Sequence, residues 1–146
     1  MPSSALPSLR RLRKQELEEA QTMLAAAQAR AMIAADAVKI AEQNLLNERE
    51  AAMDFSADDH VVEAYSRWLP VGRAALERAR GLEQDAAMEV EASRTRLTLA
   101  RAAFEAVEKL MEIRRQEKEA ASRRKEQNTL DDIAGRVRSA SEPEPE

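Results

Sequence analysis

An unbroken heptad repeat of small apolar residues constrains this chain more than any other feature of its sequence. The repeat steps by three and four residues without a slip through Leu17, Ala20, Leu24, Ala27, Ala31, Ala34, Val38, Ala41, Leu45, Glu48, Ala52 and Phe55. Only one of these positions is polar, so the pattern predicts a long helix with a continuous coiled-coil seam. We expect this helix to run from about residue 8 to about residue 54.

A second seam follows later in the chain. It passes through Leu76, Ala79, Glu83, Ala86, Val90, Ser93, Leu97, Ala100, Phe104, Val107 and Met111. Gly81 is the only breaker along it and costs about 1 kcal/mol relative to alanine. The spacing predicts a second helix over about 72–136, followed by a disordered acidic tail at 139–146.

The segment between the seams, residues 55–71, has a different composition. It contains the only Trp and the only Tyr of the chain. Ser56 followed by Asp59 resembles a capping box, which predicts a short helix over about 57–69. Pro70 cannot continue that helix comfortably, because proline lacks an amide donor. We therefore expect this segment to form the turn of a hairpin.

Together these features predict an all-α fold, a long antiparallel two-helix coiled-coil hairpin with a short helical turn segment, over residues 1–138. One register places large residues opposite small ones, and its pairs include Leu24 with Ala100, Ala27 with Leu97, Ala34 with Val90, Val38 with Ala86 and Leu45 with Ala79. In this register the N-terminal end of the first helix, near residue 6, lies opposite about residue 118. The second helix should then overhang, and it carries the apolar stripe Leu130, Ile133 and Val137 without an intramolecular partner.

No catalytic, cofactor-binding or metal-binding constellation is visible, so we expect a protein that is not an enzyme. The chain has no cysteine, one histidine (His60) and three glycines, which exclude thiolate chemistry and a glycine-rich phosphate loop. No stretch approaches the roughly 18 apolar residues of a membrane span. The first residues lack the apolar core of a signal peptide, so we expect a cytoplasmic protein.

Charge is distributed unevenly along the chain. Residues 1–14 carry four cations and no acid, residues 15–111 carry eleven basic and eighteen acidic residues, and residues 112–138 carry eight basic and six acidic ones. Three interpretations remain open for the basic ends: a solvated helix surface with intrahelical ion pairs, nucleic-acid binding through phosphates, or docking into an acidic protein pocket. The negative total charge and the interleaved acids disfavour nucleic acid.

The apolar residues of the turn segment also have two interpretations. They close the end of the coiled coil, or they leave an exposed patch for a partner, since Trp and Tyr favour binding hot spots. The overhang stripe is either a chance pattern or a contact with another helix or groove.

The chain resembles the flagellar type III export stalk proteins of the FliJ family and their YscO-like injectisome relatives. The resemblance covers about residues 6–138. The features that carry it are an alanine-rich first helix and the motifs Leu9-Arg10-Arg11-Leu12-Arg13, Arg67-Trp68-Leu69, Val107-Glu108-Lys109-Leu110, Arg114-Arg115-Gln116-Glu117, Arg123-Arg124-Lys125-Glu126-Gln127 and Leu130-Asp131-Asp132-Ile133-Ala134.

This resemblance implies a coiled-coil stalk that docks into the hexameric export ATPase ring and promotes its activity. It also implies links to the export-gate membrane protein and to export chaperones, and a location at the inner-membrane export apparatus through these partners only. The implied ring-docking residues are Arg10, Arg11, Arg13, Lys14, Arg114, Arg115, Leu130 and Ile133. The implied gate or chaperone contacts are Phe55, Tyr65, Trp68 and Leu69.

Two alternatives remain at this stage. One is a structural coiled-coil scaffold that self-associates, whereas the stalk is expected to be monomeric alone. The other is the injectisome counterpart of the same stalk.

Overall fold

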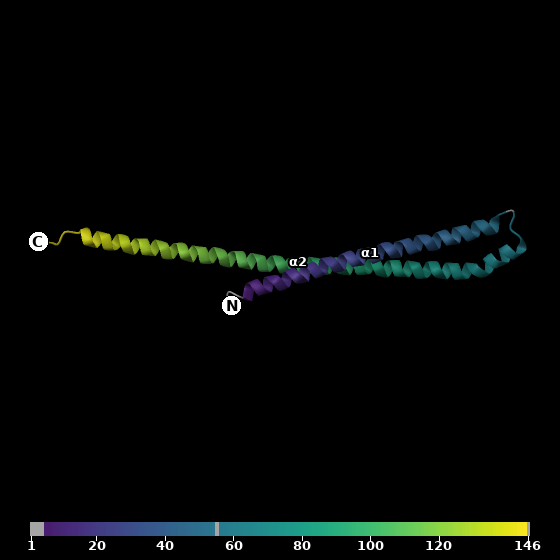
Figure 1. Cartoon of the computed structure of the whole chain (residues 1–146), viewed down its shortest axis with the longest axis horizontal. Coiled ribbons are helices and arrows are strands. Elements are labelled where there is room, and N and C mark those ends of the chain that lie inside the picture. Colours follow the sequence, from purple (N-terminus) through teal and green to yellow (C-terminus); the bar gives the residue numbers. More distant parts are fainter. Residues whose placement is uncertain (1–4, 55, 146) are drawn as a thin grey trace. The chain divides into compact units, whose positions relative to one another are not determined.

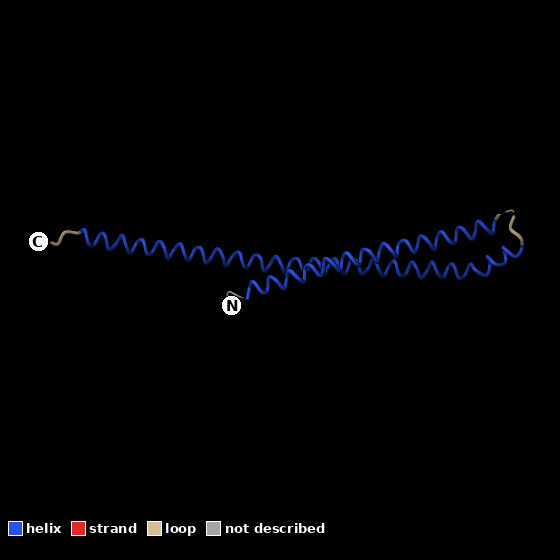
Figure 2. The backbone as a smooth tube through the Cα atoms, viewed as in Figure 1, coloured by secondary structure: helices blue, strands red, loops and turns tan. Residues whose placement is uncertain are grey.

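Two long helices make up nearly all of the structure. The computed structural model describes residues 5–54 and 56–145, in which α1 spans Ala5–Met53 and α2 spans Asp59–Ser141 (Figure 1). The described residues outside the helices form the connecting turn and the last residues before the C-terminus, and none of them is in a strand (Figure 2). The predicted all-α hairpin of two packed helices is confirmed.

The chain divides into two units, which are described separately. Unit 2 contains residues 14–102, in which most of α1, the turn and the first half of α2 form an antiparallel hairpin. Unit 1 contains residues 1–13 and 103–146, in which the start of α1 lies against the second half of α2. Both helices continue from one unit into the other.

Small side chains fill the seam of unit 2. Its buried seam residues are Ala20, Ala27, Val38, Val90 and Ser93. Ala27 and Ser93 are each only 1% exposed, which requires the opposing helix to approach closely. The Ser93 hydroxyl donates to the Glu89 carboxylate at 3.5 Å, so its burial leaves no unpaired polar group. Among the described seam positions, only Glu48 and Glu83 are exposed.

The register of unit 2 has one ion pair across the hairpin. The Arg80 guanidinium lies 3.8 Å from the Glu42 carboxylate, and both side chains are about half exposed. This pair is consistent with the predicted pairing of Leu45 with Ala79. An exposed pair at this distance contributes little free energy, so packing along the seam dominates.

The turn differs from the predicted capping box. The backbone N–H of Ser56 donates to Asp54 Oδ1 at 3.2 Å, which makes a local turn after α1. The N-cap of α2 is Asp58, whose Oδ1 accepts the N–H of Val61 at 3.1 Å. Because Asp58 satisfies an otherwise unpaired amide of the first turn, α2 begins at Asp59.

Pro70 also behaves differently from the prediction, since α2 continues through it without a break. There is no separate helix over 57–69, and α2 reaches Ser141, beyond the expected end near residue 136. Proline removes one helical hydrogen bond, to the carbonyl of Ser66. Ser66 and Pro70 are both exposed, so solvent can satisfy that carbonyl and the helix tolerates the proline.

The close approach at Ala27 gives a prediction about stability. The substitution A27L overpacks a seam position that is 1% exposed, and we expect it to lower the free energy of unfolding by about 1–3 kcal/mol. A26L, at the exposed neighbour, should change it by less than about 0.5 kcal/mol. Urea unfolding followed by circular dichroism measures both, and an equal effect of the two variants would contradict the close packing.

Candidate functional site

Arg10 attaches the start of α1 to α2 in unit 1. Its guanidinium forms an ion pair with the Glu108 carboxylate and lies 5.4 Å from the centroid of the Phe104 ring. The predicted register placed residue 6 opposite about residue 118. The observed partners of Arg10, Glu108 and Phe104, lie closer to the start of this α2 segment than that register implies. Alanine seams distinguish registers poorly. Leu6 and Val107, each 6% exposed, are buried in the same unit, so apolar packing accompanies the contacts of Arg10.

The other predicted cations have varied surroundings. Arg11 is exposed, and its guanidinium lies 3.4 Å from the Ser8 hydroxyl. Arg13 is half-buried in the same unit, whereas Lys14 is exposed at the start of unit 2. Arg114 is exposed and has no polar partner among residues 5–54 and 56–145. Among the predicted docking cations of unit 1, Arg11 and Arg114 therefore remain available to a partner protein.

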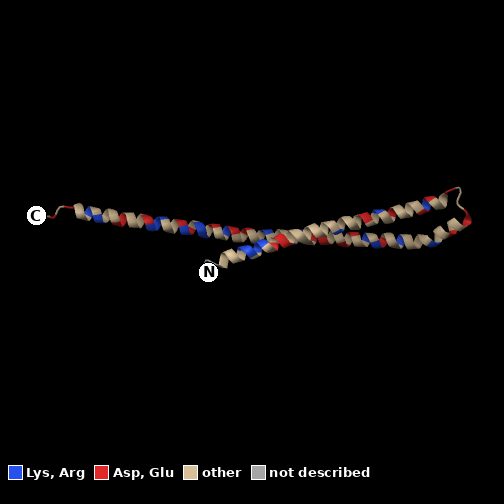
Figure 3. Ribbon diagram, viewed as in Figure 1, with Lys and Arg blue, Asp and Glu red and all other residues tan. Residues whose placement is uncertain are grey.

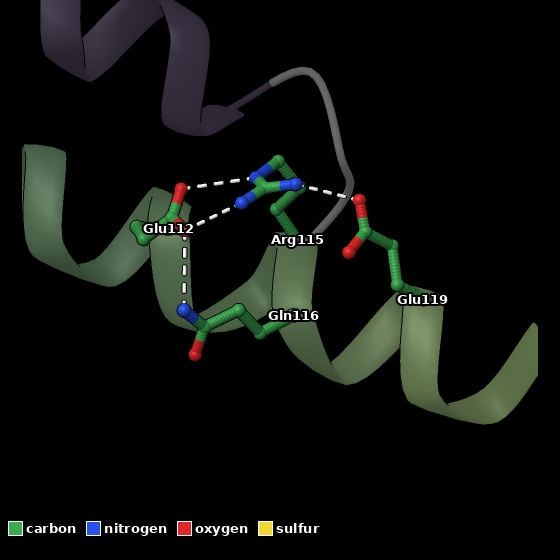
Figure 4. A network of polar contacts seen from close by, with 4 residues as sticks. All are labelled: Glu112, Arg115, Gln116 and Glu119. Carbon is green, nitrogen blue, oxygen red and sulfur yellow. Dashed lines mark hydrogen bonds and ion pairs between the residues drawn. The ribbon is translucent and has the colours of Figure 1, made fainter.

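Arg115 is held between two carboxylates of its own helix (Figure 4). It donates to both oxygens of Glu112, at 3.0 and 2.6 Å, and to Glu119 at 2.6 Å. Gln116 adds a bond to Glu112 at 3.1 Å. The hydrogen bonds from Arg115 lower the pKa of the Glu112 carboxyl, and Glu112 raises the pKa of Arg115. The charge of Arg115 is compensated within the helix, so it offers less to a partner than Arg114 does.

No described element covers the last part of α2 in unit 1. Every described residue from 121 to 145 is exposed. Leu130, Ile133 and Val137 are 60%, 51% and 63% exposed. Charged side chains occur in blocks along the same segment, basic at 123–125, acidic at 126, 131 and 132, and basic again at 136 and 138 (Figure 3). This segment, 121–141, is called the uncovered helix below.

The turn of unit 2 forms a second candidate site, a hollow of about 470 Å³ called the tip hollow below. Its lining residues are Glu48, Ala51, Asp58, His60, Val61, Ala64, Tyr65 and Trp68. Two of the predicted contacts, Tyr65 and Trp68, thus lie together. Leu69 is half-buried on α2 and does not line the hollow, and Phe55 lies outside the described residues.

Gly72 determines where the Trp68 indole lies. A Cβ atom added at Gly72 would come within 2.6 Å of Trp68 Cη2 and within 2.8 Å of Cζ3. Contacts this short are not tolerated, and the far edge of a rigid ring cannot yield as a flexible side chain does. The ring therefore packs over the backbone of Gly72, which is buried.

Sequence reasoning missed the residues that support both sites. Phe104 is a position of the predicted second seam and Glu108 lies in one of the resemblance motifs, but neither was assigned to Arg10. Gly72 could have been found, because a glycine four residues after a tryptophan leaves room for the ring on one helix face. His60, the one histidine of the chain, is exposed and lines the tip hollow, which the sequence did not indicate.

Residues 5–54 and 56–145 contain no group of three or more His, Cys, Asp or Glu side chains that could hold a metal ion. Neither helix, within the same described ranges, is long and apolar enough to cross a membrane.

Comparison with protein-family models gives a match over nearly the whole chain. A family model described as "Flagellar FliJ protein" matches residues 2–142 of this chain. The search of curated proteins found no significant match. The search of solved structures also found none.

The packing of Trp68 over Gly72 gives a prediction about fluorescence. G72A should displace the indole, shifting its emission to longer wavelength and increasing its quenching by acrylamide. G81A is the matched control, since a Cβ there meets no atom within 4 Å. It should leave the emission unchanged and raise the free energy of unfolding by about 1 kcal/mol. Unchanged emission in G72A would contradict the placement of the ring.

Proposed function

Since the chain belongs to the flagellar FliJ protein family, whose members are non-enzymatic components of the flagellar protein export apparatus, we propose that it is the coiled-coil stalk of that apparatus. In this role it docks into the hexameric export ATPase ring and promotes the activity of the ring. It also links the ring to the membrane export gate and to export chaperones.

The uncovered helix is the observation that carries this proposal. A helix whose residues 121–141 are all exposed buries no side chain against its own chain. Leu130, Ile133 and Val137 are apolar, and their burial in a partner would be favourable by roughly 25 cal/mol per Å². Insertion into a ring of subunits supplies such a surface on all sides of the helix.

The free cations of unit 1 support docking by charge. Arg11 and Arg114 are exposed and form no ion pair with any residue that the structure describes. An acidic surface on the ATPase would attract them, and this attraction falls as salt rises. Arg10 has a different role, because its contacts with Glu108 and Phe104 hold α1 to α2.

The stalk contributes no nucleotide chemistry in this proposal. ATP is bound and hydrolysed by the ring, and a single stalk contacts its subunits unequally, which changes their relative affinities. At the turn of unit 2, Tyr65 and Trp68 are the proposed contacts for the gate or the chaperones.

Charge variants test the docking to purified export ATPase. R11Q/R114Q should raise the Kd by about tenfold at low salt, because two available cations are lost. R94Q/R96Q removes the same charge from arginines that already pair with Glu91 and Glu89, and should change the Kd by less than about threefold. L130A/I133A should weaken binding by at least about tenfold.

L82A/M88A is the control for L130A/I133A. Leu82 and Met88 are at least as exposed as Leu130 and Ile133 but lie in unit 2. Fluorescence anisotropy measures binding, and phosphate release measures ring activity. The proposal fails if the wild-type chain neither binds the ring nor changes its ATP hydrolysis. It also fails if R94Q/R96Q weakens binding as much as R11Q/R114Q does, and L82A/M88A as much as L130A/I133A does.

A further inference from the structure

The tip hollow has carboxylates at its rim but no lysine or arginine. Glu48 from α1 and Asp58 from the turn both line it. Arg67, next to Trp68 on α2, does not line it and donates to Glu63 at 2.7 Å. Arg49 also lies outside the lining, beside a different hollow. His60 also lines the hollow, but the two carboxylates outnumber it, so the rim carries net negative charge.

The charge of the surrounding segment has the same sign. Residues 48–68 contain six acidic and two basic residues, a net charge of −4 from this stretch alone. Asp58 Oδ1 accepts the N–H of Val61, which fixes the carboxylate against the first turn of α2. The field at the turn of unit 2 thus favours a cationic partner.

The walls of the tip hollow are aromatic and apolar. Tyr65 and Trp68 are half-buried, so part of each ring remains accessible. The faces of these rings attract a guanidinium or an ammonium group. Ala51, Val61 and Ala64 provide apolar contacts for the methylene stem of a long basic side chain.

From these features we infer that the tip hollow binds an arginine or lysine side chain presented by a basic, partly apolar segment of a partner protein. The stem lies against the apolar wall, the charged group lies over the aromatic rings, and Glu48 and Asp58 neutralise it. A protein segment fits better than a free cation because Met53, Val61 and Val62 are 71%, 41% and 46% exposed around the turn. A free cation would leave these apolar residues uncovered.

This inference rests on the proposed function, since it specifies the chemistry of the gate or chaperone contact. The inference can fail while the proposed function stands, because binding at the tip hollow is measured without the ATPase. Trp68 is the only tryptophan in the chain, so its emission reports directly on the hollow.

The test titrates the full-length chain with a helical amidated peptide that has arginines on one face and leucines on the other, and no aromatic residue. Saturable change in Trp68 emission is expected with this peptide. No comparable change is expected with versions that carry glutamine or glutamate in place of arginine. E48Q/D58N should weaken binding of the arginine peptide by about tenfold. The D58N change keeps a side-chain oxygen that can cap α2, so the helix start is retained.

E50Q/D54N is the matched control, because it removes the same charge from two acids that lie outside the tip hollow. It should weaken binding by less than about threefold. The inference is overturned if the glutamine peptide binds as tightly as the arginine peptide, or if both double variants lose the same affinity. Displacement of the peptide by spermine at equal charge concentration would indicate a free-polyamine site and would also overturn it.

Discussion

Close approach of two helices through small side chains is the constraint on which the rest of the structure depends. Ala27 and Ser93 are nearly inaccessible in unit 2, although neither side chain is large. Each such contact buries little apolar area, so the free energy of the hairpin accumulates along its length and does not come from a thick core.

The second half of α2 is stabilised in another way. Every residue of the uncovered helix is exposed in the part of the chain that the structure describes, and the segment before it has ion pairs within the helix, such as those of Arg115 with Glu112 and Glu119. Because the folded pKa of Glu112 is lowered, this contribution is present above its unfolded pKa and is lost as pH falls through the folded value. Such pairs are weak at an exposed surface. A helix held mainly by local interactions gains order from a partner that packs around it.

The heptad steps predicted the two helices, the seam and the hairpin, because a period of 3.5 residues leaves few alternatives for a chain with so few aromatic residues. They could not locate the start of α2, since Ser56, Asp58 and Asp59 are all acceptable near a helix N-terminus and the choice depends on the path of the turn. Pro70 was expected to end a helix, but its exposed position removes most of the penalty. The partners of Arg10 depend on the register, which alanine specifies weakly. The tip hollow could not be foreseen, because α1, the turn and α2 all contribute to it.

Hydrogen exchange along α2 tests most directly whether the uncovered helix is the part of the chain that a partner orders. Amides of residues 121–141 should exchange rapidly in the chain alone, while those near Ala27 and Val90 in unit 2 exchange slowly. After addition of the purified export ATPase, residues 121–141 should become protected and the unit 2 seam should change little. Strong protection of residues 121–141 in the chain alone, or no gain of protection with the ATPase bound, would contradict the central claim.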